Sequence, residues 1–500
     1  MNGKSINKKF INATKWSTIT EISAKLVTPI TSMILARILA PEAFGVISTI
    51  TMIISFADMF TDAGFQKYLI QHEFRNDDDK FKYANVAFWT NIIVSFIIWT
   101  IIIVFRHKIA VMVGNPGLGN VAVIACVQLI FTSFSSIQMA LYRRDFDFKT
   151  LFIVRIVSIF IPFVVTIPLA ILGLNYWALI IGTICGQLSN AIIMTIKSPW
   201  KPQFFYDIKI LERMLSFSVW SLIEAISIWL TSWVDVFIIG NSLNQYYLGI
   251  YKSSTNLVNS LMSIITASIV PVLFSMLSRL QNDDKKFNDM FLKIQRVVSI
   301  FVFPLGVGVF VYSDLATKIM LGNKWSEASG VIGIWALTSS IMIVLGNFNS
   351  EVYRAKGRPK LSFLSQILHI IVLVPVCVIS SKYGFWALVN ARALIRFQGI
   401  LLGIILMKFI IGFPVGTIFK GIFPTSIASI VMGILGYMLK QVNSSLVWNF
   451  ISIIICAIVY FILLYFFTNI KQDLKTIINY IKGYISKWDA KHSTSTPGDF

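Results

Sequence analysis

The chain has 500 residues, of which 56% are hydrophobic and 13% are charged, and its mean hydropathy is +0.75. This composition excludes a soluble, disordered or fibrous protein, because soluble domains carry about 25% charged residues. The formal net charge of +20 would point to nucleic acid in a soluble protein. In a multi-pass membrane protein, basic residues collect in cytoplasmic loops, so we expect no nucleic-acid partner.

Long apolar runs predict about fourteen membrane-spanning helices, since each crossing takes roughly 20 apolar residues. In chain order we place them near 15–38, 43–65, 84–105, 119–142, 150–172, 176–196, 215–240, 247–274, 292–312, 328–350, 361–381, 384–407, 418–440 and 446–468. After these, residues 469–500 combine apolar residues at helical spacing with lysines. We expect them to form an amphipathic helix on the cytoplasmic membrane face, followed by a disordered end.

The distribution of basic residues predicts the orientation. With both termini in the cytoplasm, most Lys and Arg residues fall in cytoplasmic loops, and seven fall in outer ones: Arg37, Arg106, Lys108, Lys318, Lys324, Lys382 and Lys440. No loop breaks this alternation, which is the one that the positive-inside rule expects.

The sequence repeats itself over six spans. Trp16-Ser17 aligns with Trp220-Ser221 and Gly45 with Gly249 at an offset of 204, and further matches follow at offsets of 208 to 211. Because six is an even number, the two halves have the same orientation in the membrane. We expect an all-α polytopic membrane protein with two pseudo-symmetric six-helix bundles around a central cavity. The domains are 1–200, 201–410, two additional spans in 411–468, and the tail 469–500.

Five basic residues fall within the expected spans: Lys25, Arg155, Lys252, Arg392 and Arg396. A charge at mid-membrane costs roughly 2.5–3.5 kcal/mol on insertion scales, so each should face a cavity or have a partner. We take all five as candidate substrate-binding cations, with Lys25 and the arginine pair nearest mid-span. The alternative is local structure, in which Glu21 pairs with Lys25 and the side chains of Arg155 and Lys252 snorkel to the surface.

Acidic residues within the spans are candidates for coupling transport to an ion gradient: Glu21, Glu224, Asp58, Asp62 and Asp235. Asp62-Ala63-Gly64 also has the pattern of a helix end, so for Asp58 and Asp62 we favour a structural role. The sequence has no P-loop and no histidines at metal-ligand spacing. We expect no catalytic residue, no metal and no cofactor.

Several segments resemble the Wzx-type polysaccharide flippases of the multidrug/oligosaccharidyl-lipid/polysaccharide exporter superfamily, in the WzxC-like and teichuronic-acid-exporter branch. The likeness runs over roughly the first 400 residues, and its most specific stretch is 35–45. Others are 62–65, 141–146, 176–179, 248–251 and 321–325. In the stretch after Leu248-Gly249 the family usually has a basic residue where this chain has Ser253.

The resemblance implies a transporter of a polyprenyl-diphosphate-linked oligosaccharide across the bacterial cytoplasmic membrane by alternating access. It also implies membrane lipids, a polysaccharide polymerase and a chain-length regulator as partners. The alternative is a cation-coupled exporter of drugs or metabolites with the same fold, whose cavity should be acidic or neutral. An enzyme is disfavoured because the outer loops are short and hold no clustered acids.

Overall fold

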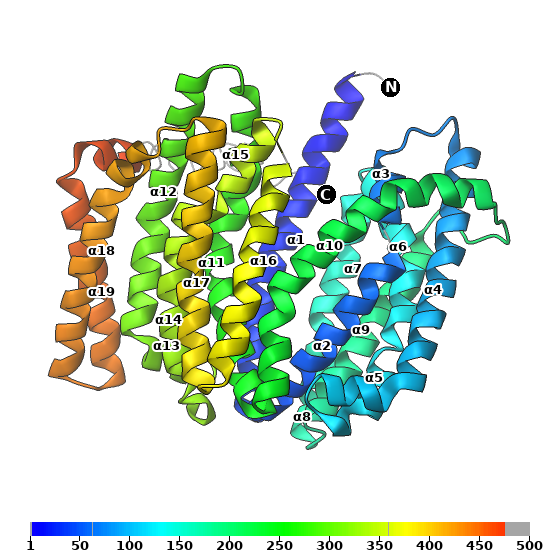
Figure 1. The fold of residues 1–500 in the computed structure, drawn as a ribbon, viewed down its shortest axis with the longest axis horizontal. Coiled ribbons are helices and arrows are strands. Elements are labelled where there is room, and N and C mark those ends of the chain that lie inside the picture. Colours follow the sequence, from blue (N-terminus) through cyan, green and yellow to red (C-terminus); the bar gives the residue numbers. More distant parts are fainter. Residues whose placement is uncertain (1–2, 63, 359, 476–500) are drawn as a thin grey trace, which may run out of the picture. The chain divides into compact units, whose positions relative to one another are not determined.

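The computed structural model describes residues 3–62, 64–358 and 360–475, and it consists of helices joined by short loops (Figure 1). The expected all-α class is confirmed, and no strand occurs among these residues. Twelve helical segments of the described chain are long and apolar enough to cross a membrane. The other two expected spans lie in helices of 36 and 35 residues, each about 50 Å long at 1.5 Å per residue. The count of fourteen therefore stays a prediction.

The helices of the first half cover residues 3–242. They are α1 (Gly3–Ile38), α2 (Pro41–Asp62), α3 (Phe65–Gln71), α4 (Asp77–Met112), α5 (Gly119–Ala125), α6 (Gln128–Arg144), α7 (Phe148–Ile161), α8 (Ile167–Ile171), α9 (Tyr176–Lys197) and α10 (Ile208–Ser242). The π-helical turn Pro162–Thr166 joins α7 to α8, so these form one span that proline interrupts.

The helices of the second half cover residues 245–465. They are α11 (Gln245–Arg279), α12 (Asp284–Val311), α13 (Ser313–Met320), α14 (Ala328–Met342), α15 (Asn349–Ala355), α16 (Lys360–Ser381), α17 (Phe385–Leu406), α18 (Gly416–Val442) and α19 (Leu446–Tyr465). Residues 468–475 of the expected amphipathic tail helix are helical, and 476–500 lie outside the described residues.

Contacts divide the chain into two compact units. The first comprises 1–260, 316–331 and 363–395, and the second comprises 261–315, 332–362 and 396–500. The expected domains 1–200, 201–410, 411–468 and 469–500 follow the sequence repeat rather than these contacts, and they stay a prediction.

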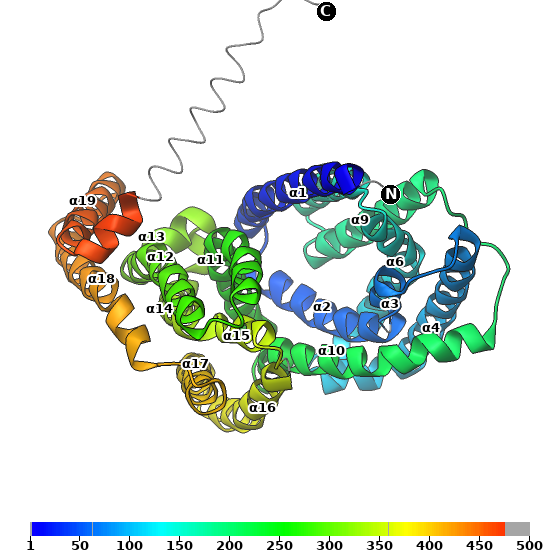
Figure 2. The same cartoon turned by 90° about the horizontal axis from the view of Figure 1, so that it is seen from above.

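In the first unit, α6 contacts several other helices. It packs against α3, α4 and α9, while α2 runs alongside α10 (Figure 2). Serines and alanines on α6 let neighbouring helices approach closely, and Ser133, Ser136 and Ala140 are buried there. The interpretation of Asp62-Ala63-Gly64 as a helix end is confirmed. Helix α2 stops at Asp62, and Gly64 adopts a left-handed φ of 79° before α3 begins.

Helices α2 and α11 begin in close contact, at the positions that the sequence repeat relates. A Cβ atom on Gly45 would collide with the carbonyl oxygen of Gln245, and one on Gly249 would collide with the carbonyl oxygen of Pro41. The offset of 204 relates Gly45 to Gly249 and Pro41 to Gln245, so the second contact is the first with the two halves exchanged. Such reciprocity is what a two-fold axis requires, because residue i meets j and j meets i.

A second pair of contacts in this unit shows the same reciprocity. The Arg37 guanidinium donates to the Ile319 carbonyl oxygen at 2.8 Å, and the Asn241 side-chain amide donates to the Met112 carbonyl oxygen at 3.3 Å. Arg37 and Asn241 are related by the offset of 204, and Met112 matches Met320, the neighbour of Ile319, at 208. The repeat is thus present in the packing as well as in the sequence.

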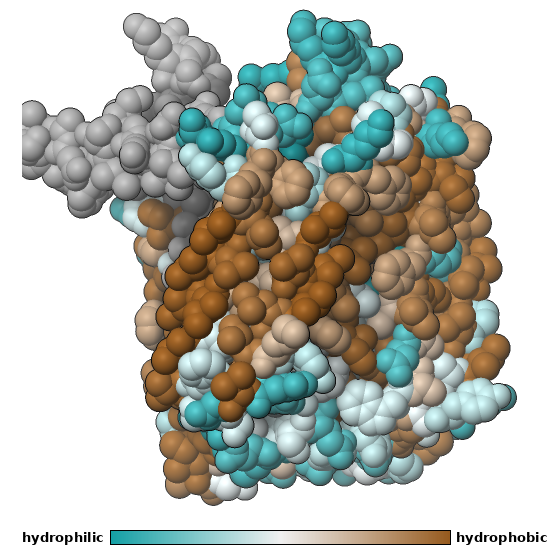
Figure 3. All heavy atoms as spheres, turned by 90° about the vertical axis from the view of Figure 1, so that its left-hand side faces the viewer, coloured by the Kyte–Doolittle hydropathy of each residue, from teal (hydrophilic) through white to brown (hydrophobic). Residues whose placement is uncertain are grey.

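In the second unit, α18 packs against both α12 and α19. Hydroxyl groups between these helices are satisfied within the protein: Tyr312 donates to the Gly436 carbonyl oxygen, and Tyr460 donates to that of Ile300. The outer face over α18 and α19 is hydrophobic across its middle and hydrophilic towards its ends (Figure 3). That band is the surface expected of helices that face lipid.

Candidate functional site

Arg392 forms a buried ion pair in the first unit. Its Nε donates to Oδ2 of Asp235 on α10 at 3.1 Å, and the side chains of Arg392 and Asp235 are 10% and 6% exposed. The same carboxylate oxygen accepts from the Tyr251 hydroxyl on α11 at 2.7 Å, and Oδ1 accepts from the Val236 amide at 2.8 Å. A candidate substrate cation and a candidate coupling acid are therefore partners of each other.

The surroundings of this ion pair are polar as well. The Arg392 guanidinium also donates to the Thr231 carbonyl oxygen at 3.4 Å, and the Gln366 amide on α16 donates to the Thr231 hydroxyl at 2.6 Å. Lys252, another candidate cation, lies one residue after Tyr251, and its Nζ sits 4.2 Å from the centre of the Trp233 ring. This cation–π contact compensates part of the cost of holding an ammonium in this expected span.

Arg396 has different surroundings, in the second unit. Its guanidinium carbon lies 3.5 Å from the centre of the Trp335 ring on α14. One of its nitrogens donates to the hydroxyl of Ser339 at 2.5 Å and to that of Thr338 at 3.4 Å. These three contacts fix the orientation of the guanidinium. A planar, fixed guanidinium suits a phosphate, which it binds through parallel N–H donors.

The remaining candidates are scattered. Lys25 is half-buried on α1, and Arg155 is exposed on α7. The side chains of Glu21, Asp62 and Glu224 lie outside the described residues, so their predicted coupling roles, and the expected Glu21–Lys25 pair, stay predictions.

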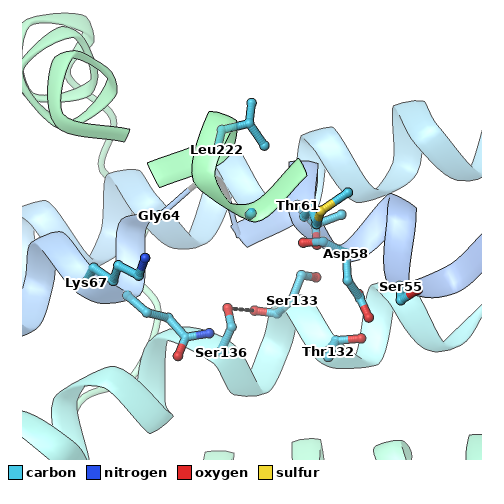
Figure 4. A pocket seen from close by; sticks show the side chains of 12 residues that line it. Ser55, Asp58, Thr61, Gly64, Lys67, Thr132, Ser133, Ser136 and Leu222 are labelled. Atoms are coloured by element: carbon cyan, nitrogen blue, oxygen red, sulfur yellow. Dashed lines mark hydrogen bonds between the residues drawn. The ribbon is translucent and has the colours of Figure 1, made fainter. Parts of the chain in front are cut away.

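Asp58 lines a cavity of about 420 Å³ between α2, α3, α6 and α10. Figure 4 shows Lys67 near one end of it, Asp58 and Ser55 near the other, and Ser133 and Ser136 between them. Sequence reasoning missed these hydroxyls because serine and threonine are common in membrane helices. The signal that was present is the cluster Thr132-Ser133 and Ser135-Ser136 on α6, in an otherwise apolar span.

Comparisons with known proteins agree on one family and one fold. The family described as "Polysaccharide biosynthesis protein" matches residues 34–330. The chain is 22% identical over 384 residues to the lipopolysaccharide biosynthesis protein WzxC of Escherichia coli (strain K12), covering 76% of each chain. It is 23% identical over 437 residues to the teichuronic acid biosynthesis protein TuaB of Bacillus subtilis (strain 168), covering 87% of this chain and 89% of that protein.

Solved structures show the fold. A lipid II flippase MurJ in an inward closed conformation superposes with a TM-score of 0.73 at 16% identity, over 90% of this chain and 98% of that one. An inward-facing multidrug resistance transporter of the MATE family, in the MOP superfamily, gives a TM-score of 0.59 at 11% identity, over 80% and 99% of the chains. The chain therefore has the helical transporter fold that these two proteins share.

Proposed function

Because the chain belongs to the polysaccharide biosynthesis protein family, we propose that it is a flippase for a polyprenyl-diphosphate-linked oligosaccharide. Relatives named for lipopolysaccharide and teichuronic acid biosynthesis match it over most of their length, and the fold is that of a lipid II flippase. The cargo of such a protein joins a polar glycan and an anionic diphosphate to a lipid tail. The protein must carry the two polar parts across a layer about 30 Å thick that excludes them.

The main structural support for the proposal is the way in which the Arg396 guanidinium is held. It is held on the Trp335 ring and by two hydroxyls, within a helix that is long and apolar enough to span the membrane. These contacts fix the orientation of the guanidinium, and its planar set of N–H donors suits a phosphate. Arg392 differs because Asp235 already neutralises it. Arg396 is therefore our first candidate for contact with the diphosphate, and Lys25 and Lys252 are further candidates.

Alternating access is the mechanism that we propose for the movement. The reciprocal contacts at Gly45 and Gly249, with Gln245 and Pro41, support it because they place a pseudo-two-fold axis at the start of α2 and α11. Repeats related by an axis along the membrane normal underlie such movements in other transporter folds.

The same proposal includes a cellular location and partner proteins. The bacterial cytoplasmic membrane is the expected location, with both termini in the cytoplasm, as the basic loops indicate. A polymerase and a chain-length regulator would use the flipped lipid-linked units. No covalent step is required of this chain, so we propose a transporter and not an enzyme.

An exporter of drugs or metabolites remains the alternative, since a multidrug transporter has the same fold. An intramembrane arginine held on an aromatic ring and by hydroxyls favours an anionic cargo over the cationic drugs that an acidic cavity would attract.

The test is deletion of the gene in its source bacterium, followed by complementation. We expect the deletion strain to lose surface polysaccharide and to accumulate the lipid-linked glycan on the cytoplasmic leaflet, where externally added periodate does not oxidise it. Wild type and the control Arg106→Gln, at the end of α4, should restore export, and Arg396→Gln should not. Normal surface polysaccharide in the deletion strain, together with increased drug sensitivity, would favour the exporter instead.

A further inference from the structure

The cavity beside Asp58 shares no lining residue with the surroundings of Arg392 or Arg396. Its walls come from α2, α3, α6 and α10, all in the first unit. At about 420 Å³ it falls within the range of about 300–1,000 Å³ usual for small-molecule pockets. A single cation with its ligands needs far less room, since one water occupies about 30 Å³.

Hydroxyl oxygens dominate the polar part of this cavity, and their protons are already engaged. Thr132 donates to the Gln128 carbonyl oxygen at 2.6 Å, and Thr61 donates to that of Asp58 at 3.0 Å. Ser133 donates in the same way within α6, at 2.7 Å. A hydroxyl has one donor and two acceptor lone pairs, so each of these groups offers its oxygen to the cavity as an acceptor.

Two more hydroxyls are fixed by partners outside the cavity. Ser136 accepts from the Asn91 amide at 3.0 Å, and Ser55 accepts from the Trp229 indole at 3.0 Å. Both are on the cavity wall, and the Asp58 carboxylate adds further acceptors between them (Figure 4). The wall is thus preorganised, because its side chains are held before any ligand arrives.

The ligand that matches these acceptors is a neutral molecule with many O–H donors. A diphosphate is a poor occupant of the end at Asp58, since it offers only acceptors and would meet that carboxylate. The donors of the lining, Lys67 and the Gln66 amide, come from α3. A sugar ring offers hydroxyl donors around its edge and C–H groups on its faces. Its hydroxyl oxygens can accept from Lys67, and its C–H faces can lie against Met59 and Leu222, which also line the cavity.

We propose that this cavity binds sugar residues of the lipid-linked oligosaccharide, as a site separate from the arginine that meets the diphosphate. This inference rests on the proposed function and adds to it the place where the glycan is recognised. It also gives Asp58 a role as a hydrogen-bond acceptor for sugar hydroxyls, in place of the ion coupling considered from the sequence.

Binding of two probes to the purified full-length protein tests the inference. The first probe is the lipid-linked glycan that accumulates in the deletion strain of the source bacterium. The second is the same material after removal of the glycan, which leaves the bare polyprenyl diphosphate. The variant is Thr61→Val/Thr132→Val, which removes two acceptors and keeps the shape of each side chain.

A matched control uses two threonines in the same helical setting. Thr51 on α2 and Thr100 on α4 donate, as Thr132 does, to the carbonyl oxygen four residues earlier, at 2.7 and 2.8 Å. Both are exposed and lie outside the cavity lining. Thr51→Val/Thr100→Val therefore reports the general effect of losing two hydroxyls. The single change Thr132→Val replaces the double variant if the latter unfolds.

We expect the cavity variant to bind the lipid-linked glycan about tenfold more weakly or worse, since two hydrogen bonds of ordinary strength are lost. Its affinity for the bare polyprenyl diphosphate, and both affinities of the control, should not change. Equal weakening for both probes, or no weakening, would overturn the inference. A thermal stabilisation of wild type by sodium over potassium, lost in the cavity variant while glycan binding persists, would also overturn it by showing a cation site.

Failure of the proposed function gives a different result. In that case the deletion strain accumulates no lipid-linked glycan, or wild type binds neither extracted probe, and the proposed function falls together with this inference. Selective loss of glycan binding in the cavity variant supports both.

Discussion

Arg392 and Arg396 lie one turn apart on α17, yet their surroundings are opposite. Arg392 is buried and paired with Asp235, which also accepts from Tyr251. Arg396 lies on the Trp335 ring and donates to two hydroxyls. The first arrangement neutralises a charge within the protein, and the second holds a charge in place.

The difference shows that an intramembrane arginine does not by itself indicate a ligand site. A buried pair is retained because each charge needs the other, and the two together need no further ligand. Arg396 is oriented by stacking and hydrogen bonds, and we propose that its guanidinium contacts the cargo. We expect the stability of the protein to depend on Arg392 and transport to depend on Arg396.

Asp235→Ala should have the largest effect. It leaves the Arg392 charge buried without this carboxylate, and breaking a buried pair costs about 3–5 kcal/mol of unfolding free energy. The measurement is reversible unfolding of the purified protein in detergent. The double change Asp235→Leu/Arg392→Met should recover most of the loss, because two apolar side chains fill the space of the pair.

The pair could still be a coupling device, and Asp235→Asn separates the two roles. If transport by this variant loses its dependence on an ion gradient while the protein stays folded, the structural interpretation of Asp235 is wrong.

Tyr251→Phe should cost less. It removes one neutral donor to the Asp235 carboxylate, and a hydrogen bond to a charged group contributes about 1.5–3 kcal/mol. Tyr247→Phe on the same helix is the control, because the Tyr247 ring stacks on Phe385 and that stacking survives the change. Equal stability of the two variants would show that the Tyr251 hydroxyl contributes nothing to holding the pair.

Arg396→Gln should reduce transport rather than stability. We expect a loss of at least tenfold in transport of the lipid-linked glycan into proteoliposomes, equivalent to about 1.4 kcal/mol, with unfolding free energy changed by less than about 1 kcal/mol. Arg396→Lys keeps the charge and loses the planar fork, so it should lie between wild type and Arg396→Gln. A fully active Arg396→Gln protein would remove Arg396 from the substrate path.

Asp314→Ala should have the smallest effect. Asp314 and Lys440 form an ion pair at 2.8 Å whose side chains are 66% and 33% exposed. Exposed pairs contribute about 0–1 kcal/mol, and salt screens them. The same unfolding assay as for Asp235→Ala gives the direct contrast between an exposed and a buried pair. If Asp314→Ala lowers the unfolding free energy as much as Asp235→Ala does, then solvent exposure does not explain how much an ion pair contributes to stability in this protein.

The sequence predicts best those features that depend on residues close together in the chain. The span positions follow from runs of apolar residues. Helix α9 begins at the expected residue 176 and ends one residue after the expected 196, and α17 differs from the expected 384–407 by one residue at each end. The repeat was visible because Gly45 and Gly249 occupy equivalent places, and the packing shows why glycine is needed at both. The end of α2 was visible because Gly64 takes a φ that other residues avoid.

The sequence predicts the charged residues of the candidate site but not their partners. The sequence shows that each of the five basic residues is costly within a span. It does not show which of them has an acidic partner. Asp235 and Arg392 are 157 residues apart, and no local pattern joins them. The acceptor-lined cavity escaped notice because Thr61 and Thr132 belong to different helices and each looks unremarkable in its own span.

The sequence by itself determined the class of protein, the positions of most apolar segments long enough to cross a membrane, the repeat and the set of charges that need an explanation. These depend on composition and spacing along one helix, since the membrane selects each span by its own hydrophobicity. Only the tertiary structure decided which arginine pairs with Asp235, which one stacks on Trp335, and where hydroxyls converge on one cavity. Those outcomes depend on which faces of distant helices meet, because the cost of a buried charge is set by the groups that packing brings to it.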